Sequence, residues 1–146
     1  MRAILPLAFG ALALAVAAHG TAPLHAADTA RNGRSPATNY MLDCQGCHLP
    51  DGSGLAGSVP SMKGELSRFL DVDGGRAFLI QVPGSANSKL SDADLADLMN
   101  WVLVAKGGAK AGAFKLYTAS EVASYRARRL VDVAGTRAEL IKHFTP

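Results

Sequence analysis

Cys44-Gln45-Gly46-Cys47-His48 is the most informative run of residues in this chain. Two cysteines separated by two residues, with a histidine directly after the second, form the attachment motif of c-type haem. The two thiols of such a motif add across the haem vinyl groups as thioethers, and the imidazole ligates the iron from one face. The spacing therefore predicts one covalently attached haem c, with Cys44 and Cys47 as the attachment sites and His48 as an axial ligand.

Three other kinds of site could use some of the same residues. A zinc site needs about four ligands, but the other histidines are His19, His25 and His143, and the first two fall in an N-terminal leader. A thioredoxin-like Cys-x-x-Cys would need a βαβ setting, which the sequence does not show. A structural disulfide would leave His48 without a role. The haem motif is therefore the favoured interpretation.

The N-terminal residues have the pattern of a secretory signal peptide. A positive charge at Arg2 precedes an almost unbroken apolar run over residues 3–18, and small residues surround Ala26. The apolar run is short for a membrane span. We assign residues 1–26 to a signal peptide, cleaved after Ala26 or Ala27, with an uncleaved N-terminal anchor as the alternative. Export of this bacterial type predicts a periplasmic protein.

The 146 residues suit one domain that follows an export signal. Charge divides the chain, because residues 28–105 carry six Lys and Arg against nine Asp and Glu, whereas residues 106–146 carry eight against three. We expect a haem domain at residues 27–106 and a basic helical extension at residues 107–146. Such a basic end more often steers a protein towards an acidic partner than binds nucleic acid, and no nucleic-acid motif accompanies it.

Helix signals recur along the chain, and no strand pattern does. Ser35 and Pro36 are the N-cap and first residue of a helix that should reach Cys44. Ser91 opens the best-marked helix, because Asp94 occupies the capping-box position. Further helices are expected at residues 65–70, 76–82 and 119–131 and from residue 136 onwards, with irregular loops at residues 49–60 and 83–89.

These features together resemble the class I cytochromes c over residues 35–105. The resemblance is carried by the haem motif, by Tyr40 one turn before it, by the Gly/Pro loop after it, and by a final helix. That helix carries the motif Leu-Ser-Asp-x-Asp-Leu-x-x-Leu-x-x-Trp over residues 90–101 and ends at Gly107. It implies a small all-α fold whose first and last helices cross beside the haem. It also implies that the carbonyl of Pro60 accepts a hydrogen bond from the second nitrogen of His48.

The sequence departs from this family at the sixth iron ligand. Family members usually supply a methionine from the loop before the last helix, but residues 83–89 contain none. We expect Met41 and Met99 to pack within their helices. Met62 could reach the iron, although the resemblance places it on the histidine side. The other candidates are water, an open position, or a side chain from the set Asn87, Lys89 and His143.

The sequence thus predicts an exported monohaem c-type cytochrome that carries single electrons between a dehydrogenase donor and a terminal acceptor. No nucleotide-binding loop, Ser/His/Asp set or second metal cluster accompanies the haem motif, so catalysis is not expected. Two alternatives stay open: a ligand-binding or weakly catalytic haem protein with an open or non-methionine sixth site, and a cytochrome subunit of a larger oxidoreductase. The basic cluster of Arg126, Arg128 and Arg129 is either a solvated face or a docking surface for an acidic redox partner.

Overall fold

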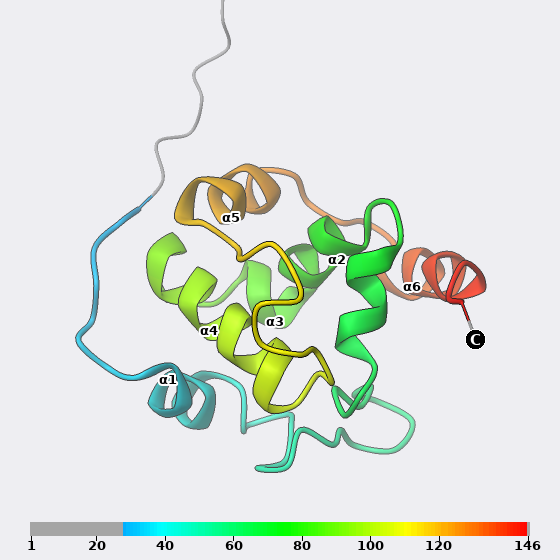
Figure 1. Ribbon diagram of the computed structural model, residues 1–146, viewed down its shortest axis with the longest axis horizontal. Helices are drawn as coiled ribbons and strands as arrows, with labels where there is room; N and C mark the ends of the chain where they lie inside the picture. The colour runs from blue at the N-terminus through cyan, green and yellow to red at the C-terminus, as the bar shows by residue number, and fades with distance from the viewer. Residues whose placement is uncertain (1–27, 146) are drawn as a thin grey trace, which may run out of the picture.

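The computed structural model describes residues 28–145, and these residues form helices and loops without any strand (Figure 1). The all-α prediction is confirmed. The elements are α1 (Pro36–Asp43), η1 (Leu66–Asp71), α2 (Gly75–Gln81), α3 (Pro83–Ala86), α4 (Asp92–Ala105), α5 (Ala119–Arg126) and α6 (Val133–Lys142). The signal peptide predicted at residues 1–26 lies outside the described residues. Between residues 28 and 145, no helix has the length and apolar character needed to cross a membrane.

The two best-marked helices begin where the capping signals predict. The side chain of Ser35 accepts a hydrogen bond of 3.1 Å from the backbone N–H of Thr38, and Pro36 is the first residue of α1. The side chain of Ser91 accepts one of 3.0 Å from the N–H of Asp94. Each cap satisfies a donor that the first turn of the helix cannot pair internally.

Three short elements differ from their predicted bounds. A single helical turn, α3, replaces the predicted start of a loop, because Pro83 already holds the backbone angle of a first helical residue. Helix α5 ends at Arg126, short of the predicted end. Helix α6 begins after Asp132, whose carboxylate accepts a 2.8 Å bond from the N–H of Gly135. The helix therefore begins at this cap, three residues before the start predicted at Thr136.

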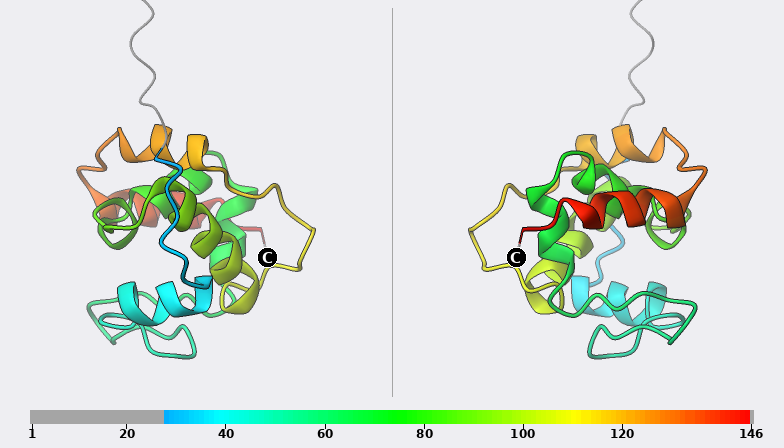
Figure 2. Two further views of the ribbon diagram at one scale, coloured as in Figure 1. Left: turned by 90° about the vertical axis from the view of Figure 1, so that its left-hand side faces the viewer. Right: turned by 90° about the vertical axis from the view of Figure 1, so that its right-hand side faces the viewer.

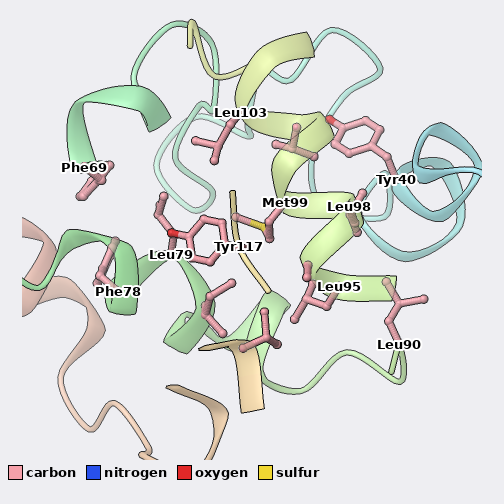
Figure 3. Packing of buried hydrophobic residues seen from close by; sticks show 14 residues of the cluster. Tyr40, Phe69, Phe78, Leu79, Leu90, Leu95, Leu98, Met99, Leu103 and Tyr117 are labelled. Atoms are coloured by element: carbon pink, nitrogen blue, oxygen red, sulfur yellow. The ribbon is translucent and has the colours of Figure 1, made fainter. Parts of the chain in front are cut away.

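Helix α4 lies at the centre of the molecule, with α1 on one side and α5 on another (Figures 1 and 2). Tyr40 of α1 is 1 % exposed, and its ring centroid lies 5.7 Å from that of Trp101 on α4. Helices α1 and α4 therefore pack against each other through this contact, as the family resemblance predicts for the first and last helices. Figure 3 shows the core on the other side of α4, where Leu95 and Met99 lie on the side of α4 that faces Leu79 of α2.

The C-terminal extension adds to this core. Its helix α5 packs against α4 and α2, and α6 packs against α2. Tyr117 and Val122 are 3 % and 0 % exposed, as expected for the hydrophobic staple of a capped helix. The ring of Phe144, beyond α6, meets the ring of Phe69 edge-on with centroids 4.8 Å apart. The domain boundary at residues 106 and 107 stays a prediction.

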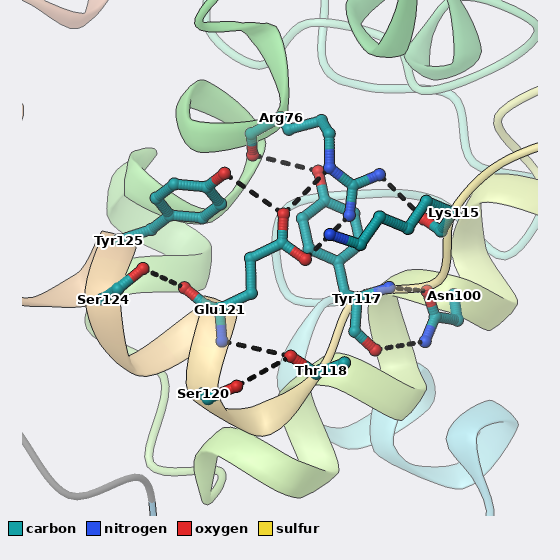
Figure 4. Close-up of polar contacts among 9 residues, drawn as sticks. All are labelled: Arg76, Asn100, Lys115, Tyr117, Thr118, Ser120, Glu121, Ser124 and Tyr125. Carbon is teal, nitrogen blue, oxygen red and sulfur yellow. Dashed lines mark hydrogen bonds and ion pairs between the residues drawn. The ribbon is translucent and has the colours of Figure 1, made fainter.

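A polar network joins the extension to α2 (Figure 4). Arg76 of α2 donates two hydrogen bonds of 2.9 Å to the carboxylate of Glu121 on α5, and a third of 2.8 Å to the carbonyl of Lys115. The hydroxyl of Tyr117 donates to the carbonyl of Arg76 at 2.9 Å. The side chains of Arg76 and Glu121 are only 20 % and 15 % exposed, so this ion pair is largely shielded from water.

Candidate haem site

The motif residues form a tight turn that continues directly from α1. Cys44 is the C-cap of α1, and the backbone N–H groups of Cys47 and His48 both donate to its carbonyl, at 3.1 and 2.9 Å. Cys44 is half-buried and Cys47 is exposed, and both carry free thiols. Burial, with smaller effects from Asp43 and Cys47, raises the pKa of Cys44 to about 11. The turn therefore presents two thiols and one imidazole within five consecutive residues.

The motif borders a cavity of about 460 Å³, which we call the motif cavity. Its wall is mostly apolar and is drawn from η1, α2, α4 and the loops around them. The residues that line it are Asp43, Cys44, Gly46, Cys47, His48, Ser58, Val59, Pro60, Ser61, Met62, Leu66, Phe69, Phe78, Leu79, Val82, Pro83, Gly84, Ser85, Ser88, Leu95, Leu98, Met99, Val102, Val133 and Arg137.

His48 stands in this wall with an unsatisfied ring nitrogen. The side chain is half-buried, and burial lowers its pKa, which favours the neutral imidazole that binds metals. Its Nδ1 atom is buried and has no hydrogen-bond partner among the described residues. A buried polar atom without a partner is costly, and Nδ1 is the nitrogen for which the family resemblance implies a bond to the carbonyl of Pro60. That leaves Nε2 as the nitrogen available to a ligand in the cavity that His48 lines.

The hydrogen bond predicted between His48 and the carbonyl of Pro60 is absent from the structure, in which the Nδ1 atom of His48 has no partner among the described residues. Pro60 does line the same cavity. Its carbonyl instead lies beside Gly54, where a Cβ atom would sit 2.7 Å from the oxygen of Pro60 and 1.9 Å from that of Val59. The loop can close this tightly only because residue 54 is glycine, and that closure fixes where the carbonyls point.

Two methionines line the motif cavity. Met62 is half-buried in the loop before η1, and Met99, 7 % exposed, projects from α4. The expectation that Met99 packs in the core is confirmed. The expectation that Met41 packs within its helix is wrong, because Met41 is 53 % exposed. The buried face of α1 is formed by Asn39 and Tyr40, which leaves residue 41 on the outer face.

The non-methionine candidates for the sixth ligand lie outside the cavity wall. Asn87 and Lys89 do not line it, whereas their neighbours Ser85 and Ser88 do. His143 is exposed near the end of the chain, with its Nε2 atom 3.8 Å from a carboxylate oxygen of Glu139. In this structure, Met62 is the one sequence-predicted side-chain candidate that the fold brings to the cavity.

Comparison with known proteins identifies the family. No protein-family model matches the chain. A cytochrome c-552 of Thermus thermophilus is 33 % identical over 106 residues, covering 60 % of this chain and 81 % of the relative. A second cytochrome c-552 of Thermus thermophilus is also 33 % identical over 106 residues, covering 60 % of this chain and 72 % of that relative. The chain belongs to the class I c-type cytochromes. Membership implies covalently bound haem c and, in general terms, electron transfer.

The residues of this cytochrome fit haem c. The motif cavity combines two adjacent thiols and an imidazole with a largely apolar wall, as a flat hydrophobic macrocycle with thioether links requires. Arg137 is the one cation among the residues described in that wall, and haem brings carboxylates of opposite charge. The zinc alternative gains no support, because residues 28–145 contain no group of three or more His, Cys, Asp or Glu placed to hold a metal ion.

The sequence did not predict two features of the site, and both involve residues of the C-terminal extension. Val133 and Arg137 of α6 line the motif cavity. Arg126, which the sequence places in an exposed basic cluster, has a side chain only 17 % exposed. Helical spacing could have indicated that Arg126 is buried. It follows the buried Val122 by four residues and so lies on the same face of α5.

Proposed function

We propose that this cytochrome is an exported, periplasmic one-electron carrier that shuttles between a dehydrogenase donor and a terminal acceptor. The observation that carries the proposal is that Cys44, Cys47 and His48 together line one largely apolar cavity. Bound haem c supplies a one-electron iron couple, so no other redox group is needed. Export rests on the leader pattern of residues 1–26.

Each motif residue has a separate role in this proposal. The thiols of Cys44 and Cys47 form the two thioether links, and the imidazole of His48 is the axial ligand to the iron. Because Cys47 is exposed while Cys44 is half-buried, the edge of the group nearest Cys47 would lie closest to solvent and to a partner protein. The apolar side chains around the cavity exclude water, and together with the axial ligands they set the reduction potential.

The sixth ligand divides the proposal into two forms. In the first, Met62 ligates the iron, since the fold brings its half-buried side chain to the cavity wall. In the second, the sixth site is open and the cytochrome binds small ligands or catalyses weakly. The second form is favoured by one observation, which is that Ser85 and Ser88 are the polar side chains that residues 83–89 contribute to the cavity, and neither is a strong iron ligand.

The visible spectrum of the reduced protein, with and without carbon monoxide, tests both forms. The protein should be made in a host with c-type maturation, beside a Cys44→Ser/Cys47→Ser variant as the control. Covalent haem bands in the wild type alone support the proposed attachment, and their absence refutes it. A low-spin spectrum indifferent to carbon monoxide supports a protein ligand and the carrier function. Rapid carbon monoxide binding to high-spin iron supports the second form, in which the sixth site is open and the protein binds small ligands.

A further inference from the structure

Among residues 28–145, Arg126 is the most extensively hydrogen-bonded side chain outside the motif cavity. Its Nη1 atom donates to the carbonyl of Leu90 at 2.9 Å and to the carboxylate of Asp92 at 3.0 Å. Its Nη2 atom donates to the carbonyls of Ser88 at 2.9 Å and Ser85 at 3.3 Å. All four Nη protons are therefore used, although Arg126 is at least 34 residues away from each acceptor along the chain.

The three backbone acceptors belong to one short stretch, residues 83–91, which we call the α3–α4 segment. Beyond the single turn of α3, its local bonds are few: the N–H of Ser88 donates to the carbonyl of Ser85 at 3.3 Å, and the N–H of Leu90 donates to the side chain of Ser88 at 3.2 Å. A segment with so little regular pairing depends on tertiary contacts for its position. Arg126 provides three of them at once.

The same segment forms part of the wall of the motif cavity. Pro83, Gly84, Ser85 and Ser88 all line that cavity, so two of the residues whose carbonyls Arg126 holds are also wall residues. Ser85 and Ser88 therefore cannot shift away from Arg126 without moving part of the wall. The link is direct, because the bonded carbonyl and the lining atoms belong to the same residue.

The charge of Arg126 is not available to a partner protein. Its side chain and that of Asp92 are 17 % and 11 % exposed, and the two form an ion pair at 3.0 Å. The Nε atom of Arg126 is buried without a hydrogen-bond partner among the described residues. A docking residue would present its charge to solvent, whereas this guanidinium is shielded and directed at backbone oxygens. Charge-assisted hydrogen bonds in such shielded surroundings are the strong ones.

We propose that Arg126 is a positioning residue of the haem site, which fixes the α3–α4 segment and thereby limits access of small molecules to the iron. This inference rests on the proposed function and deepens it, because it makes the extension part of the haem pocket. Arg126 does not touch the haem in this proposal. It acts through the wall that Ser85 and Ser88 contribute.

The test compares Arg126→Gln with Arg76→Gln in the covalently loaded protein. Arg76 is a matched control, because it is similarly buried and also anchors α5, but its bonds go to Glu121 and Lys115 and leave the α3–α4 segment untouched. Both variants should melt at a lower temperature. Imidazole should associate with the ferric iron of Arg126→Gln at least about tenfold faster than with wild type, because the substitution removes three bonds to the segment and the loss of even one charge-assisted hydrogen bond corresponds to about tenfold. The rate for Arg76→Gln should match wild type.

Equal imidazole rates in the two variants would overturn the proposal, because Arg126 would then be a stabilising residue only. If Arg126→Gln does not accumulate, Arg126→Lys keeps the charge with fewer donors and should give an intermediate rate. Hydrogen exchange gives a readout that does not depend on haem chemistry: the amides of residues 84–91 should exchange faster in the Arg126 variant than in Arg76→Gln. Unchanged exchange there would refute the positioning role, whereas absent haem bands in the wild type would refute the proposed function instead.

Discussion

Replacing Glu121 by Gln should show how firmly the extension is joined to the haem domain. The substitution keeps the shape of the side chain and removes the charge that receives two 2.9 Å bonds from Arg76. Because both side chains are at most 20 % exposed, water cannot fully replace the lost interaction. A hydrogen bond to a charged group contributes ~1.5–3 kcal/mol, so we expect a loss of about 2 kcal/mol in the free energy of unfolding. For a domain of this size that corresponds to roughly 6–10 °C in Tm.

The pH dependence of the same variant checks the cause. Burial alone would raise the pKa of Glu121, but the hydrogen bonds and charge of Arg76, with a bond from Tyr125, outweigh it and hold the pKa below its ordinary value of 4.5. A carboxylate with a lowered pKa contributes stability that is complete above the unfolded-state pKa and is lost as the pH falls through the folded-state pKa. The Tm difference between wild type and Glu121→Gln should therefore be constant near neutral pH and shrink below about pH 4.5.

Thermal unfolding of the loaded protein, followed by far-ultraviolet circular dichroism, measures both effects. Glu139→Gln is the control, because Glu139 forms a comparable pair with Lys142 on α6 but both side chains are more than 60 % exposed. Exposed pairs of this kind contribute little, so its Tm should not change measurably. An unchanged Tm for Glu121→Gln at neutral pH would refute the reasoning, as would a difference that persists undiminished into acid.

Three further outcomes are expected. Gly54→Ala should destabilise the loaded protein by more than about 2 kcal/mol in denaturant unfolding, because its Cβ would meet a carbonyl oxygen at 1.9 Å and force the loop open. Met62→Leu should let reduced iron bind carbon monoxide, whereas Met99→Leu should alter only stability; indifference of the Met62 variant would remove that residue from the coordination sphere. Neutralising Arg128 and Arg129 together should slow electron transfer to an acidic partner in stopped-flow at low salt and matter little at high salt. Equal low-salt rates would leave those arginines as an ordinary solvated face.

The parts of the structure that the sequence predicts are those encoded by nearby residues. The caps at Ser35 and Ser91 form as expected, because the capping oxygen and its donor are three residues apart. Tyr40 and Trp101 meet across α1 and α4, since both fall on apolar helix faces marked by spacing alone. The haem motif is likewise local, so its three reactive groups are found by inspection of five residues.

The parts that the sequence does not predict depend on contacts between distant residues. The carbonyl of Pro60 lies beside Gly54 instead of bonding His48, and only the path of the whole loop decides that position. Arg137 reaches the motif cavity because α6 folds back against α2, a placement that no nearby residue encodes. Three arginines close together in the sequence predict an exposed basic cluster, yet Arg126 turns inwards because its face of α5 is the buried one.

The positioning role proposed for Arg126 would also let this cytochrome do without the usual loop methionine. In the class I pattern that the chain resembles, a methionine before the last helix binds the iron, and that bond would also tether the loop. Residues 83–89 contain no methionine, so coordination by methionine cannot hold the segment in place. Three hydrogen bonds from Arg126, to the carbonyls of Ser85, Ser88 and Leu90, hold the α3–α4 segment from the side of α5 instead. In this proposal Arg126, which does not line the motif cavity, supplies from outside it the restraint that coordination by a loop methionine would supply from within. Such a role would account for a buried arginine on a helix that the minimal fold does not need.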